Sequence, residues 1–247
     1  MKSQMIPFGG GVLTEGPLLA RDPGSCLFAI NYEIPPQGGY RRIDGYTLYD
    51  GSETPAAIAG SGPIRGGFIY KNEVYAIRDN AGATAGVIWK ATSSGWDEIT
   101  DALPAGGKYK FIVHNFYGAS DLLAVYGING VGKAFGFDGT TVTLITTGMT
   151  VDVPTNIVAF KNFLFLSFAG GSVQHSTAGD PYNWSPITGA AELAVGSDVT
   201  GFVEETGDIL AIFSDKIHLL TGTGAIIEAG ILDWTLKIHT SETGALE

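Results

Sequence analysis

The chain has 247 residues, of which 45% are hydrophobic and 16% are charged, so it can build a core and is not a disordered chain. Its net charge of −11 lacks the basic patch that is typical of nucleic-acid binders. The single cysteine, Cys26, excludes an intrachain disulfide and a zinc site made of four cysteines. The N-terminal residues lack the pattern of a secretory signal, and no apolar run approaches the about 18 residues of a membrane span. We therefore expect neither a signal nor a membrane anchor.

Residues 1–39 differ from the rest of the chain because glycine and proline are frequent there and regular patterning is weak. We expect them to form an extended Gly/Pro-rich N-terminal arm, followed by a β-propeller domain over residues 40–247. The arm carries apolar side chains at Phe8, Leu18 and Leu27. Leaving them in water costs about 25 cal/mol per Å² of apolar surface, so we expect the arm to dock on its own domain or on a neighbouring subunit.

Short polar turns recur between apolar runs at a spacing of about 45 residues. Asn72 and Asn162 stand 90 residues apart, and each follows a lysine between two apolar runs. A similar segment is centred near residue 117, and Gly207 follows 45 residues after Asn162. Apolar runs joined by Asn, Gly or Asp are typical of β-hairpins.

A second series of turns falls between those of the first. Gly51, Gly95 and Gly139 are spaced by 44 residues, and Asn183-Trp184 lies at the next corresponding position. Gly51 and Gly139 each follow an aspartate, and such Asp-Gly pairs are strong hairpin signals between apolar runs. Each period therefore contains two hairpins.

Two hairpins in about 44–45 residues make four strands, which is the size of a propeller blade. The sequence predicts an all-β, β-propeller-like fold of repeated four-stranded antiparallel blades. A β-sandwich has no reason to repeat at 44 residues, and the rungs of a β-solenoid are usually shorter. The next hairpin of the first series would fall near residue 252, so we expect Ile238–Ser241 to begin a last blade that is incomplete or irregular.

The residues that could carry chemistry show no catalytic or metal-binding pattern. No pair of histidines has metal-ligand spacing; the four are His114, His175, His218 and His239. The acidic pairs Asp97–Glu98 and Glu204–Glu205 adjoin turns, where solvated charges are common. Gly127–Gly132 leads into a strand rather than a helix, so it indicates a hairpin turn and not a phosphate loop. We predict no catalytic residue, no metal and no cofactor.

The most distinctive segment is Ser176–Ser185, in which Asp180-Pro181 indicates a rigid turn. Trp184 follows, and we expect its indole to fill a gap between blades. A platform on which a sugar ring stacks is the alternative role for this tryptophan.

Two segments resemble a known family. One is Pro23–Glu33 followed by Gly38–Tyr46, and the other is the turn that contains Ser176, Gly179, Asp180, Pro181 and Trp184. Together they resemble the propeller-containing nozzle or hub proteins of tailed bacteriophages, which lie at or below the head–tail connector.

The resemblance implies a structural virion component without enzymatic activity, made in the host cytoplasm and built into the phage tail. Several copies, often six, would form a ring that contacts the connector or adaptor and other tail proteins. Genomic DNA would pass through the ring without sequence-specific binding, and the acidic balance of the chain would avoid holding it by its phosphates.

Two other functions remain open, namely a carbohydrate-binding or glycan-cleaving propeller and a protein-interaction propeller of cellular origin. A carbohydrate propeller would gather aromatic and acidic side chains at one end of its channel. The residues to which we assign structural turn or packing roles are Asn31, Arg42, Gly45, Gly51, Asn72, Gly95, Gly139, Asn162, Asp180, Pro181, Trp184 and Gly207.

Overall fold

A computed structural model describes residues 30–33, 41–43, 45, 47–49, 51–52, 56–116, 123–205, 207–228 and 231–240. The chain divides into two units, Met1–Leu48 and Tyr49–Glu247. The predicted boundary after residue 39 lies outside the described residues, as do Phe8, Leu18 and Leu27 of the arm. The docking of the arm therefore stays a prediction.

In the first unit, the described residues form a small antiparallel hairpin of β1 (Tyr32–Glu33) and β2 (Arg41–Arg42). Asn31 adopts a left-handed conformation with φ of 59°, which Asn tolerates better than most residues. Its carbonyl accepts a hydrogen bond of 2.8 Å from the backbone N–H of Ile43, and Arg41 forms an ion pair with Glu33. The hairpin thus holds two of the residues that carry the family resemblance, Asn31 and Arg42.

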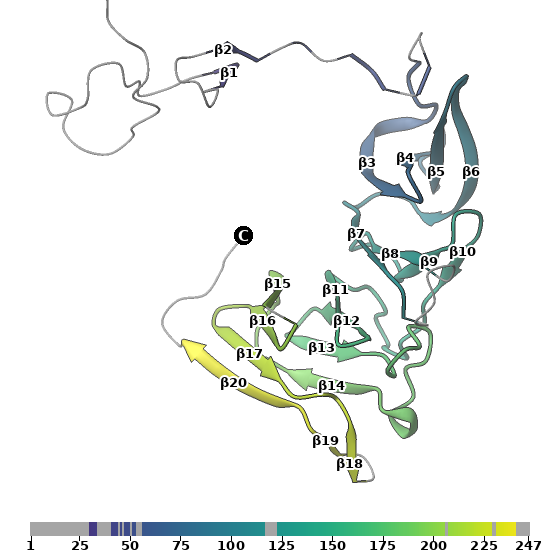
Figure 1. The fold of residues 1–247 in the computed structure, drawn as a ribbon. Coiled ribbons are helices and arrows are strands. Elements are labelled where there is room, and N and C mark those ends of the chain that lie inside the picture. Colours follow the sequence, from purple (N-terminus) through teal and green to yellow (C-terminus); the bar gives the residue numbers. More distant parts are fainter. Residues whose placement is uncertain are drawn as a thin grey trace, which may run out of the picture. The chain divides into compact units, whose positions relative to one another are not determined.

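The second unit contains four antiparallel sheets of four strands each (Figure 1). The first comprises β3 (Ser61–Tyr70), β4 (Glu73–Asp79), β5 (Ala85–Thr92) and β6 (Gly95–Pro104). The second comprises β7 (Lys110–His114), β8 (Ala124–Ile128), β9 (Phe135–Phe137) and β10 (Val142–Leu144). The third comprises β11 (Asn156–Phe160), β12 (Phe163–Phe168), β13 (Ser172–His175) and β14 (Ala191–Ala194). The fourth comprises β15 (Gly201–Glu205), β16 (Ile209–Phe213), β17 (Ile217–Thr221) and β20 (Thr235–Thr240).

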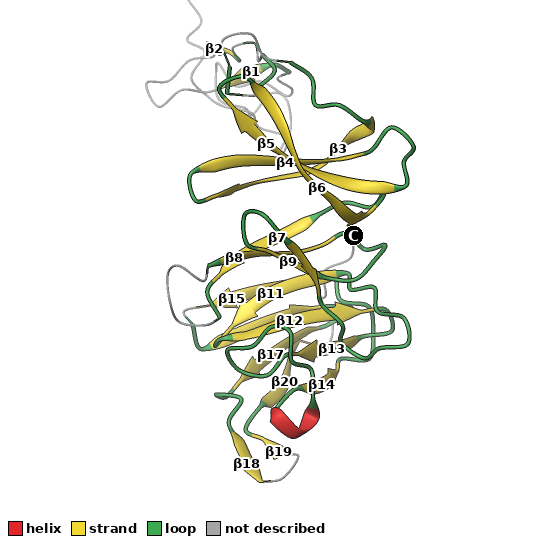
Figure 2. Ribbon diagram, turned by 90° about the vertical axis from the view of Figure 1, so that its right-hand side faces the viewer, coloured by secondary structure: helices red, strands yellow, loops and turns green. Residues whose placement is uncertain are grey.

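This succession confirms the all-β, propeller-like fold of repeated four-stranded sheets. The first strands of consecutive sheets lie side by side, β3 with β7, β7 with β11, and β11 with β15. Within each sheet the strands follow in chain order from the first strand outward, as in a propeller blade. The helical structure of the described residues is one 3-10 turn, η3 (Pro186–Thr188), which is red in Figure 2.

Three hydrophobic clusters join each sheet to the next. Their most buried members are, in chain order, Ile77, Ile88, Phe135 and Phe137; Tyr126, Ile128, Leu164 and Leu166; and Phe165, Val173, Leu210 and Ile212. Every residue of β8, β9 and β12 is buried, because neighbouring sheets cover both faces of these strands. This explains why they appear in the sequence as continuous apolar runs rather than as alternating ones.

The turns of the first series connect the first and second strands of their sheets. Lys71 and Asn72 join β3 to β4, and Lys161 and Asn162 join β11 to β12; all four have positive φ, as a type I′ hairpin requires. Gly207, with φ of 75°, lies between β15 and β16. The segment near residue 117 lies outside the described residues.

The turns of the second series connect third and fourth strands. Gly95 follows the turn between β5 and β6, and Gly139 lies between β9 and β10. Gly51 lies in no described strand, and its backbone approaches the carbonyl of Thr92 so closely that a Cβ would stand 2.7 Å from that oxygen. Gly45 likewise lies outside the described strands.

The expectation that Ile238–Ser241 begins a new blade is wrong. Thr235–Thr240 is β20, the fourth strand of the last sheet, and it pairs with β17. A two-stranded hairpin of β18 (Ile226–Glu228) and β19 (Ile231–Leu232) is inserted between β17 and β20. The inserted residues place the fourth strand later in the sequence than in the other sheets. A fixed repeat of 45 residues therefore assigns this strand to a further blade.

The left-handed hairpin turn at Asn162 generates a stability prediction. Replacing Asn162 with Val places a β-branched side chain at φ of 66° and should cost about 1–2 kcal/mol of unfolding free energy. Asn162→Gly serves as the control, because glycine adopts this conformation freely and keeps the backbone hydrogen bonds of the turn. Urea unfolding of both variants measures the difference, and equal stability of the two would contradict the type I′ geometry.

Candidate functional site

The predicted site residues do not gather in one place. Most of them lie in turns of different sheets, and the structure brings together those of the connection between β13 and β14. There Asp180, Pro181 and Trp184 form one tight loop, and the backbone N–H of Gly179 donates a hydrogen bond of 2.7 Å to the carbonyl of Asn162. This hydrogen bond attaches the loop that contains Asp180 and Trp184 to the hairpin turn at Asn162.

Hydrogen bonds fix the conformation of this loop. The Oδ1 atom of Asp180 accepts from the backbone N–H of Tyr182 at 3.0 Å, and the indole N–H of Trp184 donates to the carbonyl of Pro181 at 2.9 Å. Asn183 accepts from the backbone N–H of Ser185 at 3.1 Å through its side-chain oxygen. Asx turns of this kind pre-organise a loop. Trp184 packs against the second cluster and is half-buried.

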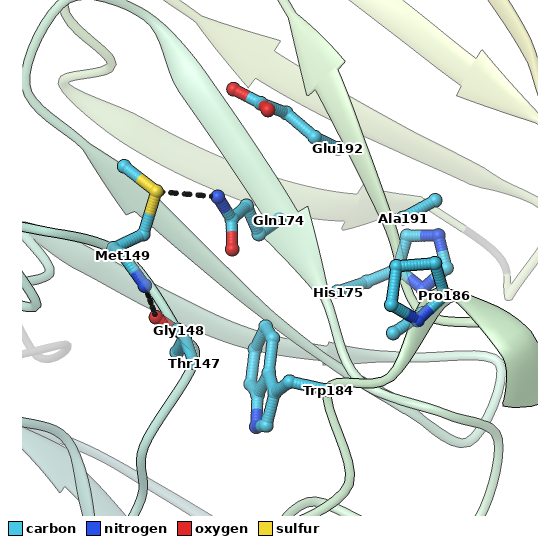
Figure 3. Close-up of a pocket in the computed structure, with 10 residues that line it drawn as sticks. Thr147, Gly148, Met149, Gln174, His175, Trp184, Pro186, Ala191 and Glu192 are labelled. Atoms are coloured by element: carbon cyan, nitrogen blue, oxygen red, sulfur yellow. Dashed lines mark hydrogen bonds between the residues drawn. The ribbon is translucent and has the colours of Figure 1, made fainter.

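A pocket of about 380 Å³ lies beside this loop (Figure 3). It is lined by Thr147, Gly148, Met149, Gln174, His175, Trp184, Pro186, Ala190, Ala191 and Glu192. Figure 3 shows Trp184 between the Thr147–Met149 segment and the Pro186 side, with Gln174 and Glu192 farther along the pocket. Among these lining residues Glu192 is the one carboxylate, whereas glycoside hydrolysis ordinarily needs two across the substrate.

His175 is held neutral by its surroundings. Its Nδ1 lies 2.8 Å from the carbonyl oxygen of Ser176, and its Nε2 lies 3.0 Å from the indole nitrogen of Trp234. An indole N–H can only donate, so Nε2 accepts and Nδ1 carries the hydrogen. Burial lowers the pKa of His175. Nε2 therefore links the third sheet to the segment that leads into β20, while Nδ1 binds the carbonyl of the next residue in the chain.

Asp79 is the most buried carboxylate in the described part of the chain, with 1% of its surface exposed. Arg65 donates to its Oδ2 from Nε at 2.9 Å and from Nη2 at 2.6 Å, and the backbone N–H of Gly106 donates to Oδ1 at 3.0 Å. Burial by itself would raise the pKa of Asp79, but these hydrogen bonds lower it below its ordinary value. The ionised carboxylate thus connects the first sheet to the segment that leads into the second.

The remaining chemical candidates are dispersed. Asp97 and Glu98 are exposed on β6, and Glu204 and Glu205 are exposed at the end of β15. The Gly127–Gly132 segment ends β8 and forms a turn closed by Asn129, whose Oδ1 accepts from two backbone N–H groups. Within the described ranges, no cluster of His, Cys, Asp or Glu could hold a metal ion. In the same ranges, no helix is long and apolar enough to cross a membrane.

The pocket is the feature that sequence reasoning missed. Trp184 was singled out by its turn, but Gln174 and Glu192 carry no motif, and strand register brings them together as direct cross-strand partners. The contact between His175 and Trp234 joins residues 59 positions apart. Neither pairing leaves a local signal in the sequence.

The buried histidine generates a prediction of pH-dependent stability. His175→Phe leaves the N–H of Trp234 and the carbonyl of Ser176 unpaired, and should cost about 1–3 kcal/mol near neutral pH. The pKa of His175 in the folded protein lies below its unfolded value of about 6.5, so the unfolded chain binds a proton first as pH falls. The wild type should therefore lose stability from about pH 7 downward, and the variant should lose less.

Urea unfolding at about pH 7.5 and about pH 5.5 measures how much unfolding free energy the wild type and His175→Phe each lose as the pH falls. His239→Gln is the matched control, because His239 is exposed on β20. An unchanged pH slope in His175→Phe would show that the histidine is not held neutral.

Comparison with known proteins identifies no family. No family model matches the chain, and no curated protein matches it. Among solved structures, the crystal structure of the computationally designed Ika4 protein is similar, with a TM-score of 0.45 and 13% identity. That alignment covers 79% of this chain and 98% of the designed one.

Proposed function

We propose that the chain is a structural component of a bacteriophage tail, a nozzle or hub protein that forms part of an oligomeric channel for the genome. Its described residues would act through surfaces, with no catalytic step and no cofactor. The proposal rests on the resemblance of the Pro23–Glu33, Gly38–Tyr46 and Ser176–Trp184 segments, on the propeller-like fold, and on the exposed apolar surface described next.

The observation that carries the proposal is an apolar hollow next to the 3-10 turn. The hollow measures about 480 Å³ and is lined mainly by apolar residues, among them Ile187, Ile226 and Leu232. Ile187 is 91% exposed, and Ile226, which lines the same hollow, is 53% exposed. Exposed apolar surface around a hollow marks a contact with another molecule. We assign it to a second copy of this chain or to a neighbouring tail protein.

The side chains on the first strand of each sheet, β3, β7, β11 and β15, support the proposal that DNA passes without being bound. The exposed ones are mostly apolar or acidic, including Ile69, Val113 and Glu204. These strands carry two cations, of which Arg65 is paired with Asp79, while Lys110 is exposed and donates to Asn156 and to the carbonyl of Thr155. Phosphates are held by Lys and Arg, so a surface with one unpaired cation makes few contacts with DNA.

The acidic balance of the chain is consistent with the same role. A ring with a net charge of −11 per copy repels a duplex rather than binding it. Virion localisation and contacts with the connector or adaptor follow from the proposal.

Assembly of the purified chain tests this function. We expect size-exclusion chromatography with light scattering to show a homo-oligomer, with the hexamer as the expected form. Ile187→Lys should shift it toward the single chain, because the lysine introduces a charge into the buried contact. Ile187 is almost fully exposed within one chain, so the variant should keep its melting temperature.

Thr143→Lys is the matched control, because it adds the same charge at an exposed position of β10. It should assemble like the wild type. A single-chain mass for the wild type at every concentration would contradict the proposal. Normal assembly of Ile187→Lys would show that another surface makes the contact.

A further inference from the structure

We propose that the pocket beside Trp184 binds one ring of a neutral saccharide. This binding site goes beyond the assembly role, and it can be measured on the purified chain whether or not the chain forms a ring. Its volume of about 380 Å³ is within the range of about 300–1,000 Å³ typical of small-molecule sites. Its wall combines one aromatic side chain with a few polar groups, which is the composition that such sites share.

Trp184 supplies the apolar wall. Its indole N–H is occupied by the carbonyl of Pro181, so the ring is fixed and the pocket meets its carbon surface rather than its donor. One side of a pyranose ring presents C–H groups, which pack on a flat aromatic surface and leave water at little cost. The hydrogen-bonded loop around Asp180 holds the indole in place before any ligand arrives, which reduces the entropy cost of binding.

Gln174 and Glu192 supply the polar wall. They are direct partners across the antiparallel pair β13–β14, so their side chains project from the same face of the sheet. The Nε2 of Gln174 faces the sulfur of Met149, and a thioether is a weak acceptor that a ligand oxygen can replace. Glu192 accepts from the hydroxyl of Ser172 at 2.7 Å through one oxygen. An amide and a carboxylate together can both donate to and accept from sugar hydroxyls.

The charges around the pocket select a neutral ligand. None of its lining residues is Lys or Arg, and His175 is neutral, so a phosphate or an acidic sugar would meet only the repulsion of Glu192. An amine is the competing ligand, since a cation could lie on the indole near this carboxylate. Gln174 favours the saccharide, because its amide can both donate to and accept from sugar hydroxyls, whereas an ammonium group uses only its acceptor oxygen.

Titration of the purified full chain with methyl hexopyranosides tests the proposal, with tryptophan fluorescence and amide NMR shifts as readouts. The probes are the methyl glycosides of glucose, galactose and mannose, and choline is the probe for an amine. We expect at least one glycoside to bind with millimolar affinity and to shift amides of β13, β14 and the Trp184 loop. Trp184→Ala and Gln174→Ala should each weaken this binding by about tenfold or more, which corresponds to about 1.4 kcal/mol.

Trp96→Ala is the matched control, because Trp96 is a half-buried tryptophan on β6 that does not line the pocket. It should bind the glycoside like the wild type. Gln174→Ala keeps the test valid if Trp184→Ala does not fold. Absence of any shift up to tens of millimolar glycoside, binding that survives both pocket variants, or binding of choline alone would each overturn the proposal.

Discussion

Burial of apolar side chains between consecutive sheets is the constraint on which this structure depends. A four-stranded sheet with apolar residues on both faces cannot exist alone in water, and each of the middle strands β8, β9 and β12 is buried along its whole length. Burying one large apolar side chain contributes about 1.5–3 kcal/mol. The three clusters that join neighbouring sheets thus hold the second unit together.

Close approach of neighbouring sheets constrains the sequence in turn. At Gly136 on β9, a Cβ would stand 2.1 Å from the hydroxyl of Tyr182, which comes from the loop of the third sheet. At Gly224, a Cβ would stand 2.5 Å from the rings of Phe163 and Trp234. Glycine at these two points leaves room for aromatic side chains of neighbouring elements. The aromatic contacts among Phe163, Phe165, His175 and Trp234 then complete the boundary between the third and fourth sheets.

Local turn chemistry made the repeated sheets predictable. Lys71-Asn72 and Lys161-Asn162 adopt a left-handed turn, which Asn tolerates better than most residues, and the turn fixes which apolar runs pair. The inserted β18–β19 hairpin was not predictable from the period, because an insertion obeys no repeat. Its apolar residues Ile226 and Ile231 are exposed, and the sequence alone cannot tell an exposed isoleucine from a buried one.

The pocket was only partly predictable, because some of its residues meet through strand register alone. The Asp180-Pro181 turn and its tryptophan are visible in the sequence, whereas Gln174 and Glu192 meet through a strand register that only the folded sheet sets. The exposed hollow around Ile187 depends on the same loop, since η3 follows Trp184 directly. One connection between two strands therefore supports both the proposed assembly surface and the proposed saccharide site.

The central claim is that this chain is a tail component that works by assembly. Cryo-electron microscopy of particles of the proposed phage tests that claim most directly. The account predicts a ring of copies around the tail channel, below the head–tail connector, with the four-stranded sheets of Ser61–Thr240 fitting the density. Particles with complete tails that lack the chain would contradict it.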